Sequence, residues 1–153
     1  MDKKIEIIKK VRKNLLDRVA NLTIDQLNEI PLGFNNNIAW NLGHIIAEQQ
    51  GVCYRRANLN LVVEENYFNT YKPGTKPEQA ISNTAIEQMK GLLCASIDQF
   101  ETDYKNNLFA TYPAWITSQG VEVNSIDAAI DFILFHDGLH IGYIMALKRI
   151  IKS

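Results

Sequence analysis

Histidine is the residue type in this sequence with the clearest capacity for chemistry, and the chain has three: His44, His136 and His140. His136 and His140 are four residues apart within a helical pattern, so a helix places both imidazoles on one face. His44 falls within a separate helical pattern. Three imidazoles can hold a divalent metal and leave a coordination position open. If the two helices pack together, the histidines predict a metal site.

The residues alone leave alternatives open at each of these positions. A metal-free structural bundle explains the histidines as well as a metal site does. His44 by itself favours a solvent-exposed histidine on a wet helix face; the alternative is a polar pocket wall in which Glu48, one turn later, is its partner. Asp137 is expected to be a solvated surface carboxylate. His136-Asp-Gly-Leu-His140 also lacks the glutamate that serves as general base in the zincin motif.

The metal would have to supply most of any chemistry. Neutral imidazole suits nickel, zinc or iron rather than magnesium or calcium. The sequence contains no convincing nucleophile–base pair, phosphate loop or basic, aromatic-rich surface. The chemistry predicted for the site is therefore activation of a bound water or a bound thiol.

Length and composition narrow the class of protein. The 153 residues predict a single domain over residues 1–153, and the net charge of −1 gives no reason to expect nucleic acid or anionic membrane as a partner. No apolar run is expected to span a membrane, and the charged N-terminus does not resemble a signal peptide. Cys53 and Cys94 are interpreted as buried, reduced thiols of a cytoplasmic protein, with a disulfide as the alternative.

Apolar periodicity predicts an all-α fold. Long helices are expected over residues 3–20, 37–57, 77–104 and 125–151, with Pro77 at the first position of the third and Ser125 capping the last. Thr23 and Gln26 form a capping box that opens a short helical turn. Residues 58–76 are expected to form a long loop, either a plain crossover or a lid. Residues 105–124 are irregular, with a short extended turn around Gly120.

The last helix is apolar on two sides. One side carries His136 and His140, and the other carries Leu134, Ile141 and Met145 beside Gly138 and Gly142. A helix that is apolar on two sides is central to a fold or buried in an oligomer. The two glycines would allow another helix to approach closely, which favours a homodimer.

Three stretches resemble the DinB/YfiT-like superfamily along nearly the whole chain. They are Ile38-Ala-Trp40-Asn-Leu-Gly-His44-Ile-Ile, Tyr67-Phe68 followed by Pro73-Gly74-Thr-Lys-Pro77, and Phe132-Ile-Leu-Phe-His136-Asp-Gly-Leu-His140-Ile-Gly142. The resemblance implies an up-down-down-up four-helix bundle with long crossover loops, usually dimeric. It also implies a metal, commonly nickel or zinc, on the positions matching His44, His136 and His140.

The resemblance says less about function. Relatives include thiol-dependent enzymes, among them bacillithiol S-transferases and mycothiol-dependent maleylpyruvate isomerases, which implies a small-molecule substrate and a low-molecular-weight thiol cofactor. We therefore hold three hypotheses. The first is a metal-dependent enzyme, either an S-transferase-like or a hydrolase-like one. The second is a non-catalytic dimeric metal-binding or stress-response bundle. The third is a metal-free interaction module.

Overall fold

Helices make up most of the computed structural model, which describes residues 3–152. The four long helices are α1 (Lys3–Val19), α3 (Ile38–Gln49), α5 (Asn83–Lys105) and α6 (Ile126–Lys152). The short helices α2 (Ile24–Asn28) and α4 (Glu65–Tyr71) lie in the connections, and a π-helix, η1 (Gln50–Arg55), continues α3. The strands in the described part are β1 (Trp115–Ile116) and β2 (Glu122–Val123). The all-α prediction is confirmed.

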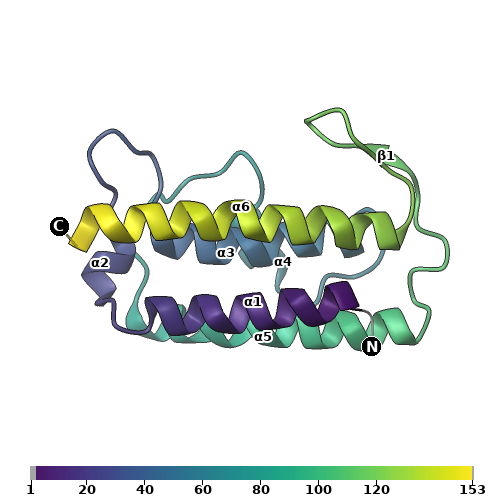
Figure 1. Cartoon of the computed structure of the whole chain (residues 1–153), viewed down its shortest axis with the longest axis horizontal. Helices are drawn as coiled ribbons and strands as arrows, with labels where there is room; N and C mark the ends of the chain where they lie inside the picture. Colours follow the sequence, from purple (N-terminus) through teal and green to yellow (C-terminus); the bar gives the residue numbers. More distant parts are fainter. Residues whose placement is uncertain (1–2, 153) are drawn as a thin grey trace.

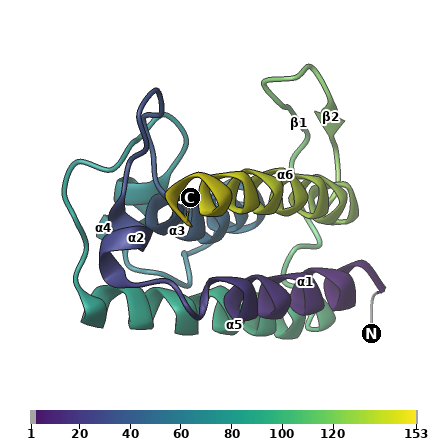
Figure 2. The same cartoon turned by 60° about the vertical axis from the view of Figure 1, so that its left-hand side comes forward.

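The four long helices pack as two layers. Figure 2 shows α3 and α6 above α1 and α5. Both α1 and α3 pack against α5 and against α6. In Figure 1, α1 and α6 run in one direction and α3 and α5 run in the other. Because α3 and α6 are antiparallel, moving toward the C-terminus of α3 leads toward lower residue numbers in α6.

Three helix starts that carry a polar capping residue lie where the sequence predicted them. Thr23 and Gln26 form the expected capping box, since each side chain bonds the other residue's backbone N–H. The side chain of Asn37 accepts a hydrogen bond from the backbone N–H of Trp40 and opens α3. The hydroxyl of Ser125 accepts one from the N–H of Ala128 at the start of α6. These caps satisfy backbone donors that have no partner within the helix.

Two predictions between α3 and α5 were wrong. Residues 58–76 are not a plain loop, because they contain α4. The third long helix does not begin at Pro77; it begins at Asn83, where the hydroxyl of Ser82 accepts a hydrogen bond from the N–H of Ala85. Residues 78–80 are exposed. A helix that began at Pro77 would bury no apolar side chain at these positions, so nothing would stabilise it there. The helix begins instead after the capping residue Ser82.

The extended turn around Gly120 is a short β-hairpin. Trp115 pairs with Val123 and Ile116 with Glu122 in antiparallel register. Gly120 has a φ of +80°, a left-handed conformation that glycine adopts without strain. Trp115 packs edge-on against Phe132 of α6, with ring centroids 5.8 Å apart. The hairpin therefore covers the first half of α6.

A layer of polar side chains divides the hydrophobic core. One buried cluster includes Leu15, Ile46, Leu93 and Ile144, and the other includes Ile8, Val52, Ile97 and Ile133. Buried Arg12, Gln49, Ser96 and Asp137 lie between these positions in α1, α3, α5 and α6 respectively. Each long helix thus contributes one polar residue to the middle of the bundle. We call these four residues the polar layer.

The last helix also corrects an expectation about membranes. Residues Ile126–Ile151 are long and apolar enough to cross a membrane, by length and composition alone. A core helix of a soluble bundle has the same length and composition. The helix α6 packs against α1 and α3, and its ionisable residue Asp137 lies in the polar layer. We interpret α6 as a core helix of the bundle.

Candidate metal centre

The three histidines converge where α3 meets α6. One ligand atom from each of His44, His136 and His140 can be chosen so that all lie within 4.8 Å of one another. The ring centroids are 5.1 Å apart for His44 and His136, 4.6 Å for His44 and His140, and 4.4 Å for His136 and His140. His44 is 6% exposed, so the expectation of a solvent-exposed histidine was wrong.

The ring of His44 is held from two sides. Its Nδ1 lies 2.7 Å from the backbone oxygen of Tyr71 in α4. A carbonyl oxygen only accepts, so Nδ1 carries the proton and Nε2 keeps its lone pair for a ligand. Trp40 stacks on the ring at 4.6 Å. The α4 backbone comes this close because residue 43 is glycine: a Cβ there would be 2.5 Å from the ring of Tyr71.

Asn41 holds the ring of His140. The Nδ1 of His140 lies 2.8 Å from the side-chain oxygen of Asn41, and the Nδ2 of Asn41 donates to the backbone oxygen of Asn37 at 2.8 Å. The second bond sets the amide so that its oxygen faces the histidine. His140 therefore donates from Nδ1 and keeps the lone pair of Nε2 free, as His44 does.

His136 differs from the other two histidines. Its Nδ1 is buried and has no hydrogen-bond partner among the described residues. Phe132 stacks on the other side of the ring, with centroids 6.0 Å apart. No hydrogen bond from a described residue to Nδ1 fixes the tautomer of this ring. A buried polar atom without a partner is costly, and ligand binding is one way to satisfy the imidazole.

Burial keeps the three rings neutral. It is the main cause that lowers the pKa of His44, and it lowers the pKa of His136 to about 2 and of His140 to about 4. The neighbouring histidines lower the pKa of His136 and His140 further, because two cations side by side repel each other. Neutral imidazole is the form that binds a metal. The donor set therefore fits a divalent transition metal at neutral pH.

Asp137 is not the solvated carboxylate that the sequence suggested. It is fully buried and pairs with Arg12, which is also fully buried: Nε lies 2.7 Å from Oδ2 and Nη2 lies 3.3 Å from Oδ1. The Nη1 of Arg12 donates to Gln49 Oε1 at 2.7 Å, and to the Leu93 carbonyl and the Ser96 hydroxyl at longer range. No local sequence pattern identifies this burial of Arg12, because its partner lies 125 residues away.

Of two other expectations about the surroundings of the site, the one about Glu48 needs correction and the one of free thiols is confirmed. Glu48 makes no hydrogen bond to His44; the backbone of Tyr71 takes that place. Cys53 is buried and Cys94 is partly buried, and both are free. Burial raises the pKa of the Cys53 thiol, which keeps it protonated. Among the described residues, no cysteine or carboxylate joins the three histidines in the cluster.

Sequence reasoning named the three histidines but missed the groups that orient them. Asn41 was visible as a polar residue on the same helix face as His44, one turn from it in the opposite direction to Glu48. The carbonyl of Tyr71 carries no sequence signal, because every residue has one. Three nitrogen donors without a fourth protein ligand leave coordination positions for a small molecule.

Comparison with known proteins supports this description. A family model described as the DinB superfamily matches residues 7–144, which include all three histidines and most of the four long helices. No curated protein matches the chain.

Proposed function

Because this chain belongs to the DinB superfamily, we propose that it is a metal-dependent enzyme whose site is formed by His44, His136 and His140. The metal would be nickel or zinc, with iron as the alternative. The observation that carries the proposal is the convergence of three neutral imidazoles, two buried and one partly buried, of which His44 and His140 are oriented by oxygen acceptors on Nδ1. Such orientation is typical of histidines that bind metals.

The proposed reaction class is transfer or hydrolysis on a small molecule, with a low-molecular-weight thiol or water as the nucleophile. A bound metal acidifies a thiol or water and so generates a nucleophile at neutral pH. The protein contributes the rest. Tyr71 and Asn41 hold two rings in place, while Trp40 and Phe132 shield the site from water on the sides of His44 and His136.

Elemental analysis of protein purified without a histidine tag tests this function. We expect about one transition metal per chain, lost in His136→Ala. Glu122→Ala is the matched control, since Glu122 is an exposed carboxylate on the hairpin and lies outside the cluster. Absence of metal from the wild type, even after incubation with zinc, nickel and iron salts, would refute the proposal and favour the metal-free interaction module.

Thiol binding and metal removal together distinguish an enzyme from a bundle that uses metal only structurally. An open site predicts that a thiol such as 2-mercaptoethanol binds the cobalt-substituted protein and produces a sulfur-to-metal charge-transfer band. A structural site predicts no such band and a large fall in melting temperature when the metal is removed. The second result would favour the non-catalytic, stress-response alternative.

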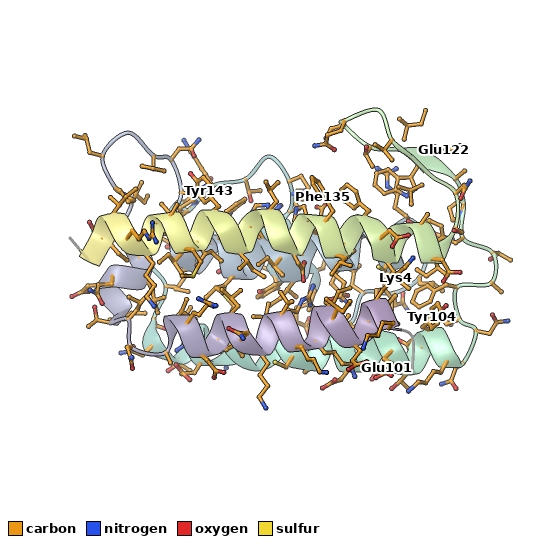
Figure 3. All side chains as sticks on the ribbon, viewed as in Figure 1. Lys4, Glu101, Tyr104, Glu122, Phe135 and Tyr143 are labelled. Carbon is orange, nitrogen blue, oxygen red and sulfur yellow. The ribbon has the colours of Figure 1, made fainter. Side chains whose placement is uncertain are left out.

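We also propose that two copies associate through the outer face of α6. Phe135 is 60% exposed and Leu139 is 57% exposed, and within residues 3–152 nothing packs over Gly138 or Gly142. Figure 3 shows Phe135 and Tyr143 on the side of α6 that points away from α1. An apolar face of this kind on a soluble bundle is typical of an interface. Sedimentation should show a dimer for the wild type and for Leu32→Glu, and a monomer for Leu139→Glu.

A further inference from the structure

Glu48 is a carboxylate in the middle of the bundle with no assigned role. It is the residue before Gln49, at the end of α3, and its side chain is partly buried. Among the described residues, none donates a hydrogen bond to it and none forms an ion pair with it. Carboxylates inside proteins are normally paired. A partly buried carboxylate without a hydrogen-bond partner is therefore a candidate for acting on a molecule that enters from solvent.

Helical register places Glu48 on the same side of α3 as the candidate metal centre. It lies four residues after His44, so the two side chains are neighbours on one face of the helix. That face points toward α6, because the ring of His44 lies 5.1 Å from the ring of His136.

The polar layer gives the position of Glu48 along the bundle. Arg12 hydrogen-bonds both Gln49 of α3 and Asp137 of α6, so these two residues lie at one level. Because α3 and α6 are antiparallel, their neighbours Glu48 and His136 lie one residue to opposite sides of this level, about 3 Å apart along the bundle axis. Two observations therefore place Glu48 beside the candidate metal centre: the face of α3 on which it lies, and its position along the bundle axis.

We propose that Glu48 is the proton acceptor for the thiol or water that enters the three-histidine site. The inference rests on the proposed function. The carboxylate takes the proton of the S–H or O–H bond, and the electron pair of that bond stays on sulfur or oxygen. The nucleophile then forms a bond to an electrophilic substrate. As the leaving group departs with its electron pair, it takes the proton back from Glu48, so the carboxylate is regenerated.

The surroundings of Glu48 suit this role. Burial raises its pKa to about 7, and the guanidinium of Arg56 opposes part of the rise. A base that titrates near neutral pH can both accept and return a proton. Arg56 is held over the ring of Trp115 at 4.2 Å, and Trp115 packs on Phe132 beside His136.

Other ionisable groups near Glu48 come from three further elements besides its own helix. They are His44 on α3, Cys53 on η1, Arg56 directly after η1, Arg12 on α1, and His136 and Asp137 on α6. Arg12 and Asp137 neutralise each other in an ion pair, and the Cys53 thiol stays protonated. Arg56 is therefore the charged neighbour that acts on the carboxylate.

Counting protons tests this role without an enzymatic assay. Cobalt-loaded protein is titrated calorimetrically with 2-mercaptoethanol at pH 7.5 in buffers of different ionisation enthalpy. We expect the wild type to release well under one proton per thiol, because Glu48 retains it. Glu48→Gln should release about one proton, since the bound thiolate then has no acceptor. Glu48→Asp should return toward the wild type, and Glu122→Gln should match it.

The possible outcomes separate the two proposals. If Glu48→Gln binds metal normally and releases as few protons as the wild type, Glu48 is not the acceptor, although the metal site stands. Loss of metal from Glu48→Gln with retention in Glu48→Asp would make Glu48 a metal ligand, and this too overturns the role. Failure of the wild type itself to bind cobalt refutes the proposed function, and the role of Glu48 with it.

Discussion

Two polar clusters lie side by side in this bundle, and they differ in how their polar atoms are satisfied. The polar layer around Arg12 is complete: the guanidinium bonds a carboxylate, an amide oxygen, a carbonyl and a hydroxyl. The three-histidine cluster is incomplete, because its three rings converge with free lone pairs and the Nδ1 of His136 has no partner. Asp137 and His136 are adjacent in sequence, yet they belong to different clusters.

This difference indicates which cluster stabilises the fold and which cluster can bind a ligand. A polar group whose bonds are all supplied by the protein contributes to the fold and offers nothing to a ligand. A cluster that leaves neutral donors unsatisfied at one point is prepared for a group that the protein does not contain. The following predictions test that distinction, beginning with the largest effect.

Removing one member of the polar layer should be severe. Arg12→Met leaves the buried carboxylate of Asp137 without its partner, so we expect the free energy of unfolding to fall by about 3–5 kcal/mol. Urea denaturation with linear extrapolation measures this. Arg18→Met, on the exposed side of the same helix, should change it by about 0.5 kcal/mol or less.

The double variant Arg12→Met with Asp137→Leu sharpens this prediction. With both charges replaced by apolar groups, most of the lost stability should return. A double variant as unstable as the single one would show that the layer stabilises the fold by its geometry rather than by charge compensation.

Metal should stabilise the protein through the other cluster. At a free metal concentration about 100 times Kd, the free energy of unfolding should rise by about 2.7 kcal/mol. His136→Leu should abolish this rise. Without metal, the same variant should be close to neutral in stability, because it removes a buried nitrogen that lacks a partner. A large loss of stability in the metal-free variant would instead show that His136, like Arg12, stabilises the fold.

Substitutions of Asn41 test whether its side-chain oxygen, by orienting His140, contributes to metal affinity. Asn41→Leu removes the acceptor that orients His140, and we expect metal affinity to fall about 10- to 100-fold. Asn41→Asp keeps an oxygen acceptor and should retain affinity near that of the wild type. Competition with a chromophoric chelator measures both. Equal losses in the two variants would mean that Asn41 acts through packing and not through its oxygen.

Acid should weaken the metal-free protein gradually. The unfolded chain binds protons on its histidines below their ordinary pKa of 6.5, whereas the folded chain resists protonation until about pH 4 at His140 and about pH 2 at His136. The unfolded state therefore binds more protons in this window, and stability falls as pH decreases below 6.5. Thermal melts of metal-free wild type and His136→Leu should diverge, with the wild type losing more. Parallel curves would contradict buried, neutral rings.

Much of the fold was predictable because the signals are local. Apolar spacing identified α1 and α6 almost to their ends, and polar caps at Thr23, Asn37 and Ser125 marked helix starts. Besides the start of α5, the exception is α4, whose seven residues have no side-chain cap and are held by Tyr71 packing on Gly43. That contact joins two separate stretches of the chain, so a local pattern cannot reveal it.

The sequence by itself determined which residues can bind a metal, because the chain contains three histidines and a helix puts two of them on one face. It did not decide which polar residues near them face solvent. Arg12 and Asp137 both look like surface residues in their own helices, yet each is buried against the other. Only the tertiary structure decided this, because the cost of burying a charge depends on a partner that lies far away in sequence. The same reason explains Tyr71 and Asn41, whose oxygens orient His44 and His140 only after α4, α3 and α6 have packed together.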